Sequence, residues 1–144
     1  MKSKTFKRFV ASSLAGISLI ASAAAFSAVA VIVHPSNGNS LSQSDITRIF
    51  LGKKKSFPDG ADAIPVDQQE GSAARSAFVG TILKKNDQQI KAYWAQLLFT
   101  GKGTPPKEVG SGADVKKLVS ENPALIGYID AAEADASVKI VHQF

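Results

Sequence analysis

The chain has 144 residues, enough for one domain, and it contains no cysteine, which excludes disulfides and thiol chemistry. Its formal net charge is +5, but four of its 17 basic residues and none of its 12 acidic residues lie in the first 25 positions. The remainder carries 13 basic against 12 acidic residues, so charge gives no support for binding to nucleic acid or to a membrane surface.

The first 25 residues have the pattern of a secretory signal peptide. Four basic residues precede an uncharged apolar run over 9–26, and the three alanines at 23–25 fit a small-residue cleavage site. We therefore expect cleavage between Ala25 and Ala28, export to the periplasm, and a single domain over residues 28–144. The alternative is a retained transmembrane helix, for which the run is marginal in length and rich in Ala and Ser.

The first predicted element of the domain is a strand in the apolar run AVAVIV at 28–33. Its length and β-branched content favour a strand buried on both faces, as in a parallel sheet. Turn residues follow at 34–39, and then a short helix capped by Ser42 or Ser44, with Gly52 at its C-terminal stop.

A second strand is predicted at Ala63–Val66, followed by a helix that begins after Ser72. A further helix begins at Asn86 or Asp87, and its apolar residues recur at helical spacing, which predicts a core role for the aromatic pair within it. These apolar residues are Ile90, Tyr93, Trp94, Leu97 and Leu98.

The last third of the chain contains a predicted loop, a helix and two strands. Glycine and proline mark the loop at 100–110, and Ser111 with Asp114 predicts a capped helix whose buried face is Val115, Leu118 and Val119. Strands are predicted at 125–129 and 137–142, and the glycine at 127 indicates a close backbone approach.

This alternation of strands and helices predicts an α/β sandwich with a mostly parallel sheet. Ligands of such sheets bind at the carboxyl ends of the strands. We therefore expect the turns at 34–39 and 67–72 to open at the same edge.

The stretch from Ile64 to Ile82 is a candidate anion site because it reads as strand, turn and helix start. The first N–H groups of a helix have no intrahelical partner, and the helix dipole is positive there. Gly71, Ser72 and Ala73 are small enough to let an anion approach the backbone, and Arg75 adds a positive charge. The alternative is an ordinary helix start that holds only water.

Two carboxylates, Asp67 and Glu70, lie in the same turn. A carboxylate normally repels an anion, but it can accept the proton that hydrogenphosphate keeps at neutral pH and that sulfate lacks. The alternative is that both are solvated turn residues.

Catalytic and metal-binding patterns are not found in the sequence. His34 and His142 have no second ligand at zinc spacing, and Ser72 lies in EGSAA, which lacks the second glycine of a nucleophile elbow. Phosphate-binding loop and dinucleotide signatures are also missing. We therefore expect a non-enzyme without metal or cofactor.

Several segments together resemble the phosphate ABC transporter substrate-binding proteins, and more closely a short, single-lobe group of exported proteins similar to them. These segments are VAVIVHPSN, IFLGK, FPDG, VDQQEGSAAR, YWAQLLFTGKGTPP and NPALIGYID, in that order. The resemblance implies one lobe of a type 2 periplasmic-binding-protein fold, a three-layer sandwich, with phosphate or another small oxyanion as ligand. It also implies that the protein interacts with an ABC permease or another envelope protein.

The family's anion motif has an Arg, an Asp and then Gly-Ser-Gly-Thr leading into a helix. In this chain Gln68 stands at the Arg position and Glu70 at the Asp position, while Gly71 and Ser72 match directly and Ala73-Ala74 replaces Gly-Thr. One charge and one hydroxyl of the motif are therefore missing.

The expected ligand shell combines this motif with groups from elsewhere in the chain. Arg75 would restore the charge, and Ser36 and Asn37 of the first strand's turn would complete the near wall. Because the family's second lobe is missing, a homodimer or a partner protein would supply the far wall. The alternative function is a ligand-free protein-interaction or sensory module in the envelope.

Overall fold

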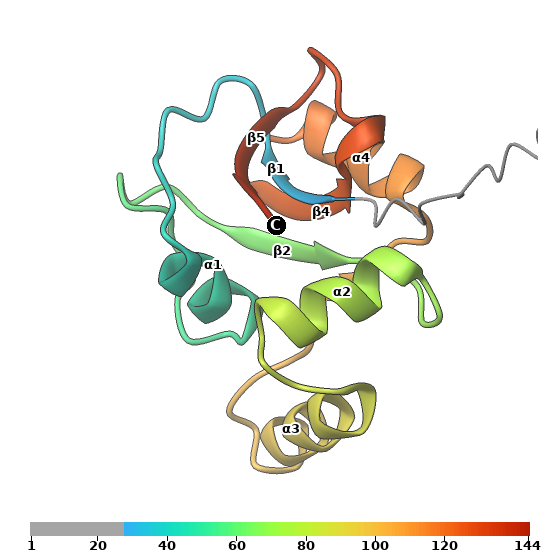
Figure 1. The fold of residues 1–144 in the computed structure, drawn as a ribbon. Helices are drawn as coiled ribbons and strands as arrows, with labels where there is room; N and C mark the ends of the chain where they lie inside the picture. Colours follow the sequence, from blue (N-terminus) through green and yellow to red (C-terminus); the bar gives the residue numbers. More distant parts are fainter. Residues whose placement is uncertain (1–27) are drawn as a thin grey trace, which may run out of the picture.

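The computed structural model describes residues 28–144, which form one β-sheet with helices on both of its faces (Figure 1). The predicted signal peptide of residues 1–25 lies outside the described residues. The elements in chain order are β1 (Val29–Val33), α1 (Gln43–Phe50), β2 (Ile64–Asp67), α2 (Ala73–Thr81), α3 (Asp87–Phe99), β3 (Lys107–Glu108), α4 (Gly112–Glu121), β4 (Leu125–Asp130), the short 3-10 helix η1 (Ala131–Glu133) and β5 (Lys139–Gln143).

The strands are arranged in the order β3-β2-β4-β1-β5. β2 is parallel to both β3 and β4, whereas β1 is antiparallel to both β4 and β5. Four of the five strands therefore point the same way, which confirms the predicted α/β fold with a mostly parallel sheet. The prediction was wrong for β1, which is fully buried but antiparallel to both of its neighbours.

Two apolar cores lie on opposite faces of the sheet, because side chains of β1 alternate between them. Val31 packs in the core beneath α1 and α2, where the Phe78 ring stacks on the Tyr128 ring with centroids 4.2 Å apart. Ile32 packs in the core beneath α4, against Val115. Helices on both faces of one sheet confirm the predicted three-layer sandwich (Figure 1).

Gly127 in β4 is a point of close approach between α4 and the sheet. A methyl group at this position would lie 2.4 Å from Cγ1 of Val115 and 3.2 Å from Cγ2 of Val66. Both contacts are shorter than an ordinary van der Waals approach, so only glycine fits without movement of the helix. The close backbone approach predicted from the sequence is confirmed.

The helix starts follow the predicted caps. Ser42, Ser72, Asn86 and Ser111 are the N-cap residues, and three of these starts are closed by reciprocal capping boxes. The start of α2 is the exception: the Ser72 hydroxyl accepts from the backbone N–H of Arg75, and no side chain returns to the cap backbone.

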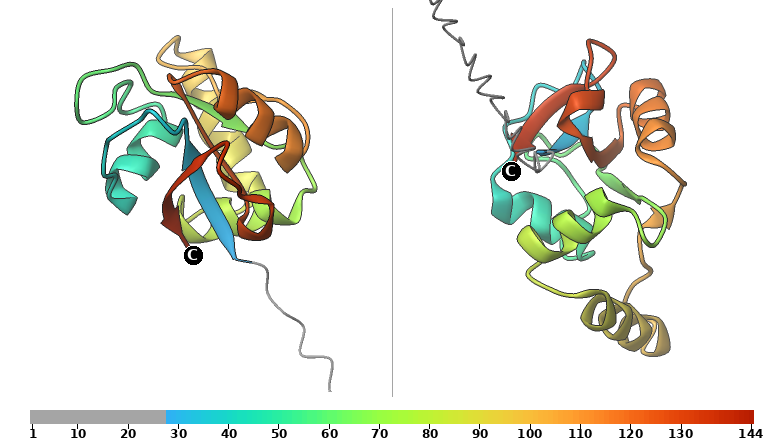
Figure 2. Two further views of the ribbon diagram at one scale, coloured as in Figure 1. Left: turned by 90° about the horizontal axis from the view of Figure 1, so that it is seen from above. Right: turned by 45° about the vertical axis from the view of Figure 1, so that its right-hand side comes forward.

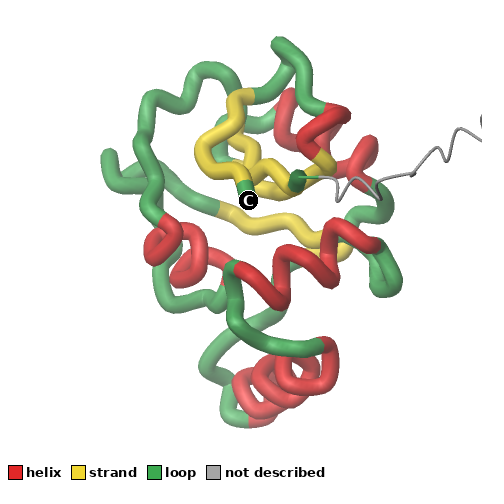
Figure 3. The backbone as a smooth tube through the Cα atoms, in the orientation of Figure 1, coloured by secondary structure: helices red, strands yellow, loops and turns green. Residues whose placement is uncertain are grey.

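Three local predictions were wrong. The predicted loop at 100–110 contains the two-residue strand β3, which exists only through its pairing with β2 and therefore leaves no local signal. Leu118, predicted to be buried, is 36% exposed. Leu98, which the helical pattern grouped with the apolar residues of α3, is 51% exposed because it borders the cavity between α3 and the segment before β3. Figure 3 shows that the chain between β1 and β2 is loop on both sides of α1.

Helix α3 stands out from the rest of the molecule (Figure 2). It is anchored by Trp94, which is 8% exposed and belongs to the core beneath α1 and α2, as predicted. Tyr93 is half-buried, and its hydroxyl donates to the carbonyl oxygen of Leu51 at 2.6 Å. Within residues 28–144, the helices are too short or too polar to cross a bilayer.

Candidate functional site

The predicted strand, turn and helix start of the candidate site is confirmed. β2 ends at Asp67, and a turn that contains Gly71 at φ +85° leads to Ser72, the N-cap of α2. No hydrogen-bond acceptor is found in residues 28–144 for the backbone N–H groups of Ala73 and Ala74. These groups and the dipole of α2 give the turn a positive electrostatic character.

Gln68 and Ser72 are hydrogen-bonded to each other at the base of this turn. The Ser72 hydroxyl donates to Oε1 of Gln68 at 2.5 Å, and Nε2 of Gln68 donates to the backbone carbonyl of Tyr128 at 2.8 Å. Gln68 is only 3% exposed. Its amide therefore connects the turn to β4 and is not directed toward solvent.

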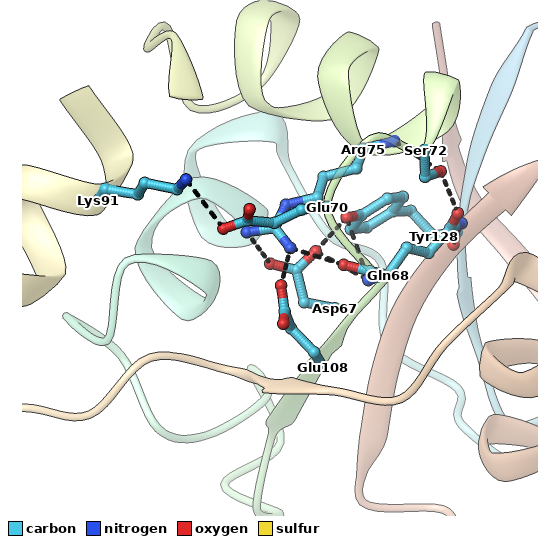
Figure 4. A network of polar contacts seen from close by, with 8 residues as sticks. All are labelled: Asp67, Gln68, Glu70, Ser72, Arg75, Lys91, Glu108 and Tyr128. Carbon is cyan, nitrogen blue, oxygen red and sulfur yellow. Dashed lines mark hydrogen bonds and ion pairs between the residues drawn. The ribbon is translucent and has the colours of Figure 1, made fainter. Parts of the chain in front are cut away.

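Arg75 reaches back under the turn and is held by three acceptors (Figure 4). Its guanidinium donates to the backbone carbonyl of Gln68 at 2.7 Å, contacts the carboxylate of Glu108, and lies 3.7 Å from the carboxylate of Asp67. Burial alone would lower the pKa of Arg75, but the contacts with Glu108 and Asp67 raise it overall. The cation is thus charged and already paired.

Asp67 and Tyr128 form the buried end of the same network. The Tyr128 hydroxyl donates to Asp67, whose other carboxylate oxygen faces Arg75. Burial raises the pKa of Asp67, although Tyr128 and Arg75 both oppose the shift. Burial and the neighbouring carboxylate raise the pKa of Tyr128, so its hydroxyl keeps its proton. The network consequently rigidifies the carboxyl end of β2.

Lys91 is a functional candidate that the sequence did not indicate. It lies on α3, and its ammonium is 3.2 Å from the exposed carboxylate of Glu70. Both residues line a cavity of about 90 Å³, whose other lining residues are Gly71, Arg75, Asp87 and Ile90. No local pattern could have paired Lys91 with the turn, because only the packing of α3 beside α2 brings it there.

A larger cavity of about 430 Å³ adjoins the same residues, between α3 and the segment that leads into β3. Its charged wall consists of Asp67, Glu70, Arg75, Lys91 and Glu108. Its apolar wall consists of Ile90, Trp94, Ala95, Leu98, Pro105 and Pro106. Glu108 is the second residue that the sequence missed, since it belongs to the unpredicted strand β3.

A second helix start lies near Gln68. A methyl group at Gly112, the first residue of α4, would lie 3.5 Å from Nε2 of Gln68. The N–H of Gln69 donates to the carbonyl of Gly110 at 2.8 Å, which fixes the two turns side by side. Two positive helix ends therefore flank the carboxyl end of β2.

The structure does not bring Ser36 and Asn37 to this site. Because β1 is antiparallel to β4 and β2 is parallel to it, the turn after β1 opens at the opposite end of the sheet. There Ser36 lies 2.7 Å from Nδ1 of His34, and Asn37 accepts from Asn39. The expectation that both turns share one edge was wrong, since it assumed that β1 and β2 run the same way.

Metal-binding clusters of three or more His, Asp or Glu residues do not occur in the part of the chain that the structure describes. The charged groups around Arg75 are spread over β2, α2, α3 and β3, and they include two cations. Their arrangement is that of an ion-pair network next to a small polar cavity.

No protein-family model matches this sequence, and no curated protein matches it. Solved structures with the same fold were found, among them the following three. The first is a protein described as a phosphate ABC transporter substrate-binding protein from Clostridium perfringens, with bound phosphate. It is 24% identical, with a TM-score of 0.63 over 78% of this chain and 43% of that one.

The other two are an ABC-type phosphate transport receptor from Vibrio cholerae and PstS from Borrelia burgdorferi. They are 18% and 17% identical, with TM-scores of 0.61 and 0.58, each over 79% of this chain. The matched part is 45% and 46% of those proteins. The chain thus spans less than half the length of these structures, and it has the fold of that part of the phosphate ABC transporter binding proteins.

Proposed function

We propose that this chain is a non-catalytic solute-binding protein of the periplasm, that its ligand is phosphate or a related small oxyanion, and that it works with an ABC permease. The observation that carries the proposal is the cavity of about 90 Å³ in which the Gly71 backbone, Arg75 and Lys91 come together. The shared fold supports it, because two of the similar structures are described as proteins of phosphate transport.

The proposed ligand shell consists of the start of α2 and the two cations beside it. The N–H groups of Ala73 and Ala74 would donate to the anion, and Gly71 leaves the backbone open to its approach. The amino group of Lys91 and the guanidinium of Arg75 would balance its charge. Ser72 would act chiefly as the N-cap that holds these N–H groups in place.

Glu70 would give the site a preference for a protonated oxyanion. Its carboxylate pairs with Lys91, both residues line the cavity, and the carboxylate can accept the proton of hydrogenphosphate. Sulfate has no proton to offer at neutral pH. We therefore expect phosphate to bind more tightly than sulfate.

The affinity would be modest. Asp67 and Glu108 already pair with Arg75, and Glu70 pairs with Lys91, so an anion has to compete with internal carboxylates. The site is also open to water on one side, where competing hydration persists. A second copy of the chain or an envelope partner would close that side.

The experiment is calorimetric titration of the purified protein with phosphate and, separately, with sulfate, at low and moderate salt. Phosphate binding with sulfate rejected supports the proposal and the role of Glu70. Equal, weak binding of both anions reduces the site to a generic helix terminus. Absence of heat at about millimolar ligand contradicts an oxyanion receptor.

A second candidate function is a ligand-free interaction or sensory module in the envelope. The favouring observation is that Gln68, Ser72 and Arg75 are all satisfied by groups of the protein itself. A site whose polar groups are all hydrogen-bonded within the protein can keep its structure without binding a ligand. In that case phosphate and sulfate will leave the melting temperature unchanged, and a specific envelope protein will co-purify.

A further inference from the structure

Helix α3 is apolar on two of its faces, and the structure accounts for only one of them. Ile90 and Trp94 face the body of the protein and are buried. Ala92, Ala95 and Phe99 recur at helical spacing on the outer face, where all three are exposed. Phe99 is 94% exposed, more than any other large apolar side chain among residues 28–144.

A hollow lies next to this outer face. The cavity of about 430 Å³ runs along α3, and its apolar wall includes Ile90, Trp94 and the two prolines before β3. Leu98, 51% exposed, is part of its lining. A hollow of this size accepts an aromatic side chain against its apolar wall, and Ala95 belongs both to that wall and to the outer face that carries Phe99.

We propose that this side of α3 is a homodimer interface, in which two α3 helices pack antiparallel about a two-fold axis and each Phe99 enters the other copy's hollow. A two-fold interface requires one patch that carries both a projection and its complement. The outer face of α3 and the adjoining cavity meet this requirement. An axis between Ala92 and Ala95 brings Phe99 of one copy toward the first turn of the other helix.

Charge complementarity selects a second copy in the antiparallel orientation. Asp87 begins α3 and Lys102 follows its end, and within residues 28–144 neither forms an ion pair. Antiparallel packing places Asp87 of each copy near Lys102 of the other and also aligns the helix dipoles favourably. The small side chains of Ala92 and Ala95 permit a close helix approach of about 8 Å.

The interface would also cover the candidate oxyanion site. Arg75 and Glu108 line the same cavity, so an inserted Phe99 ring would exclude water from that ion pair. Electrostatic interactions strengthen when water is excluded. Dimerisation itself requires no oxyanion, so it can be tested without ligand and does not rest on the proposed function.

Sedimentation velocity over about 1 to 200 µM protein, without phosphate, tests the interface. We expect a reversible dimer in the micromolar range, because one helix per copy is a small interface. Phe99→Asp should weaken it more than about ten-fold, since it removes a buried ring and adds a charge. Leu118→Asp, at an exposed leucine of α4, is the matched control and should leave the dimer intact.

Two results would overturn the inference: a monomer at every concentration, or a Phe99→Asp variant that dimerises as well as the parent. A dimer without any phosphate binding would support the interface and contradict the oxyanion proposal. Phosphate binding by a protein that stays monomeric would support the oxyanion proposal and contradict the interface. The two proposals therefore fail separately.

Cysteine cross-linking tests the orientation of the two helices. Because the sequence contains no cysteine, only the introduced residues can form a disulfide. In the antiparallel pair, residue 92 of one copy faces residue 95 of the other. The double variant Ala92→Cys, Ala95→Cys should form disulfide-linked dimers under mild oxidation far faster than either single variant. Equally fast cross-linking by each single variant indicates a parallel pair and overturns the proposed arrangement.

Discussion

The carboxylate of Glu108 contacts the guanidinium of Arg75 from a strand that lies 33 residues further along the chain. Arg75 is thereby paired on its outer side as well as on its inner side, where Asp67 and the Gln68 carbonyl hold it. A carboxylate in this place resembles the anion that the site would bind. The site therefore contains a group that competes with the ligand, and three of our predictions concern the residues that hold this arrangement together.

Glu108→Gln should increase the affinity for phosphate by about five- to ten-fold, because the amide no longer neutralises Arg75. The side chain is half exposed, so the fold should tolerate the change with little loss of stability. Calorimetric titration measures the effect, with Glu121→Gln at the exposed end of α4 as the control. An affinity equal to that of the parent would contradict the competitor role of Glu108.

Ser72→Asp should abolish oxyanion binding and leave the fold intact. Aspartate is also a good N-cap, but its charge would repel an anion at the start of α2. It would also lose the hydrogen bond that Ser72 donates to Gln68, so we expect about 1 to 2 kcal/mol of destabilisation. Titration and thermal unfolding follow the two effects. Unchanged binding would place the site elsewhere.

Asp67→Asn should change how stability depends on pH. Because burial raises the pKa of Asp67 above its ordinary value of 3.8, the folded state binds its proton more tightly than the unfolded state does. The contribution of Asp67 to stability therefore falls as pH rises from 3.8 through the raised pKa. Asparagine still accepts from Tyr128 but does not titrate.

The measurement is the difference in melting temperature between Asp67→Asn and the parent, from about pH 3 to about pH 7. The difference should move in favour of the variant as pH rises. Asp62→Asn, at an exposed carboxylate before β2, is the control. A difference that is independent of pH would show that ionisation of Asp67 has no cost in the folded protein.

Gly127→Ala should destabilise the protein by more than about 2 kcal/mol, because the added methyl group would lie 2.4 Å from Val115. The matched control is Gly38→Ala, since a methyl group there meets no atom within 4 Å. Chemical denaturation compares the two variants. Equal stability of both would mean that α4 can move away from β4 at little cost.

Much of the local structure could be predicted from the sequence because it depends on neighbouring residues. The caps at Ser72 and Ser111 are formed by groups within a few positions of each other. The apolar run of β1 predicted its complete burial. In the candidate site, the sequence predicted that Gly71, Ser72 and Arg75 surround one helix start.

Tertiary structure alone decided the direction of β1, the existence of β3, and the partners of Arg75. An apolar strand has the same composition whichever way it runs, so the sequence could not show that Asn37 lies at the far end of the sheet. A two-residue strand has no periodicity, so Glu108 was not recognised as a neighbour of Arg75. The start of α2 was therefore predictable, but the charges around it were not, because long-range packing sets them.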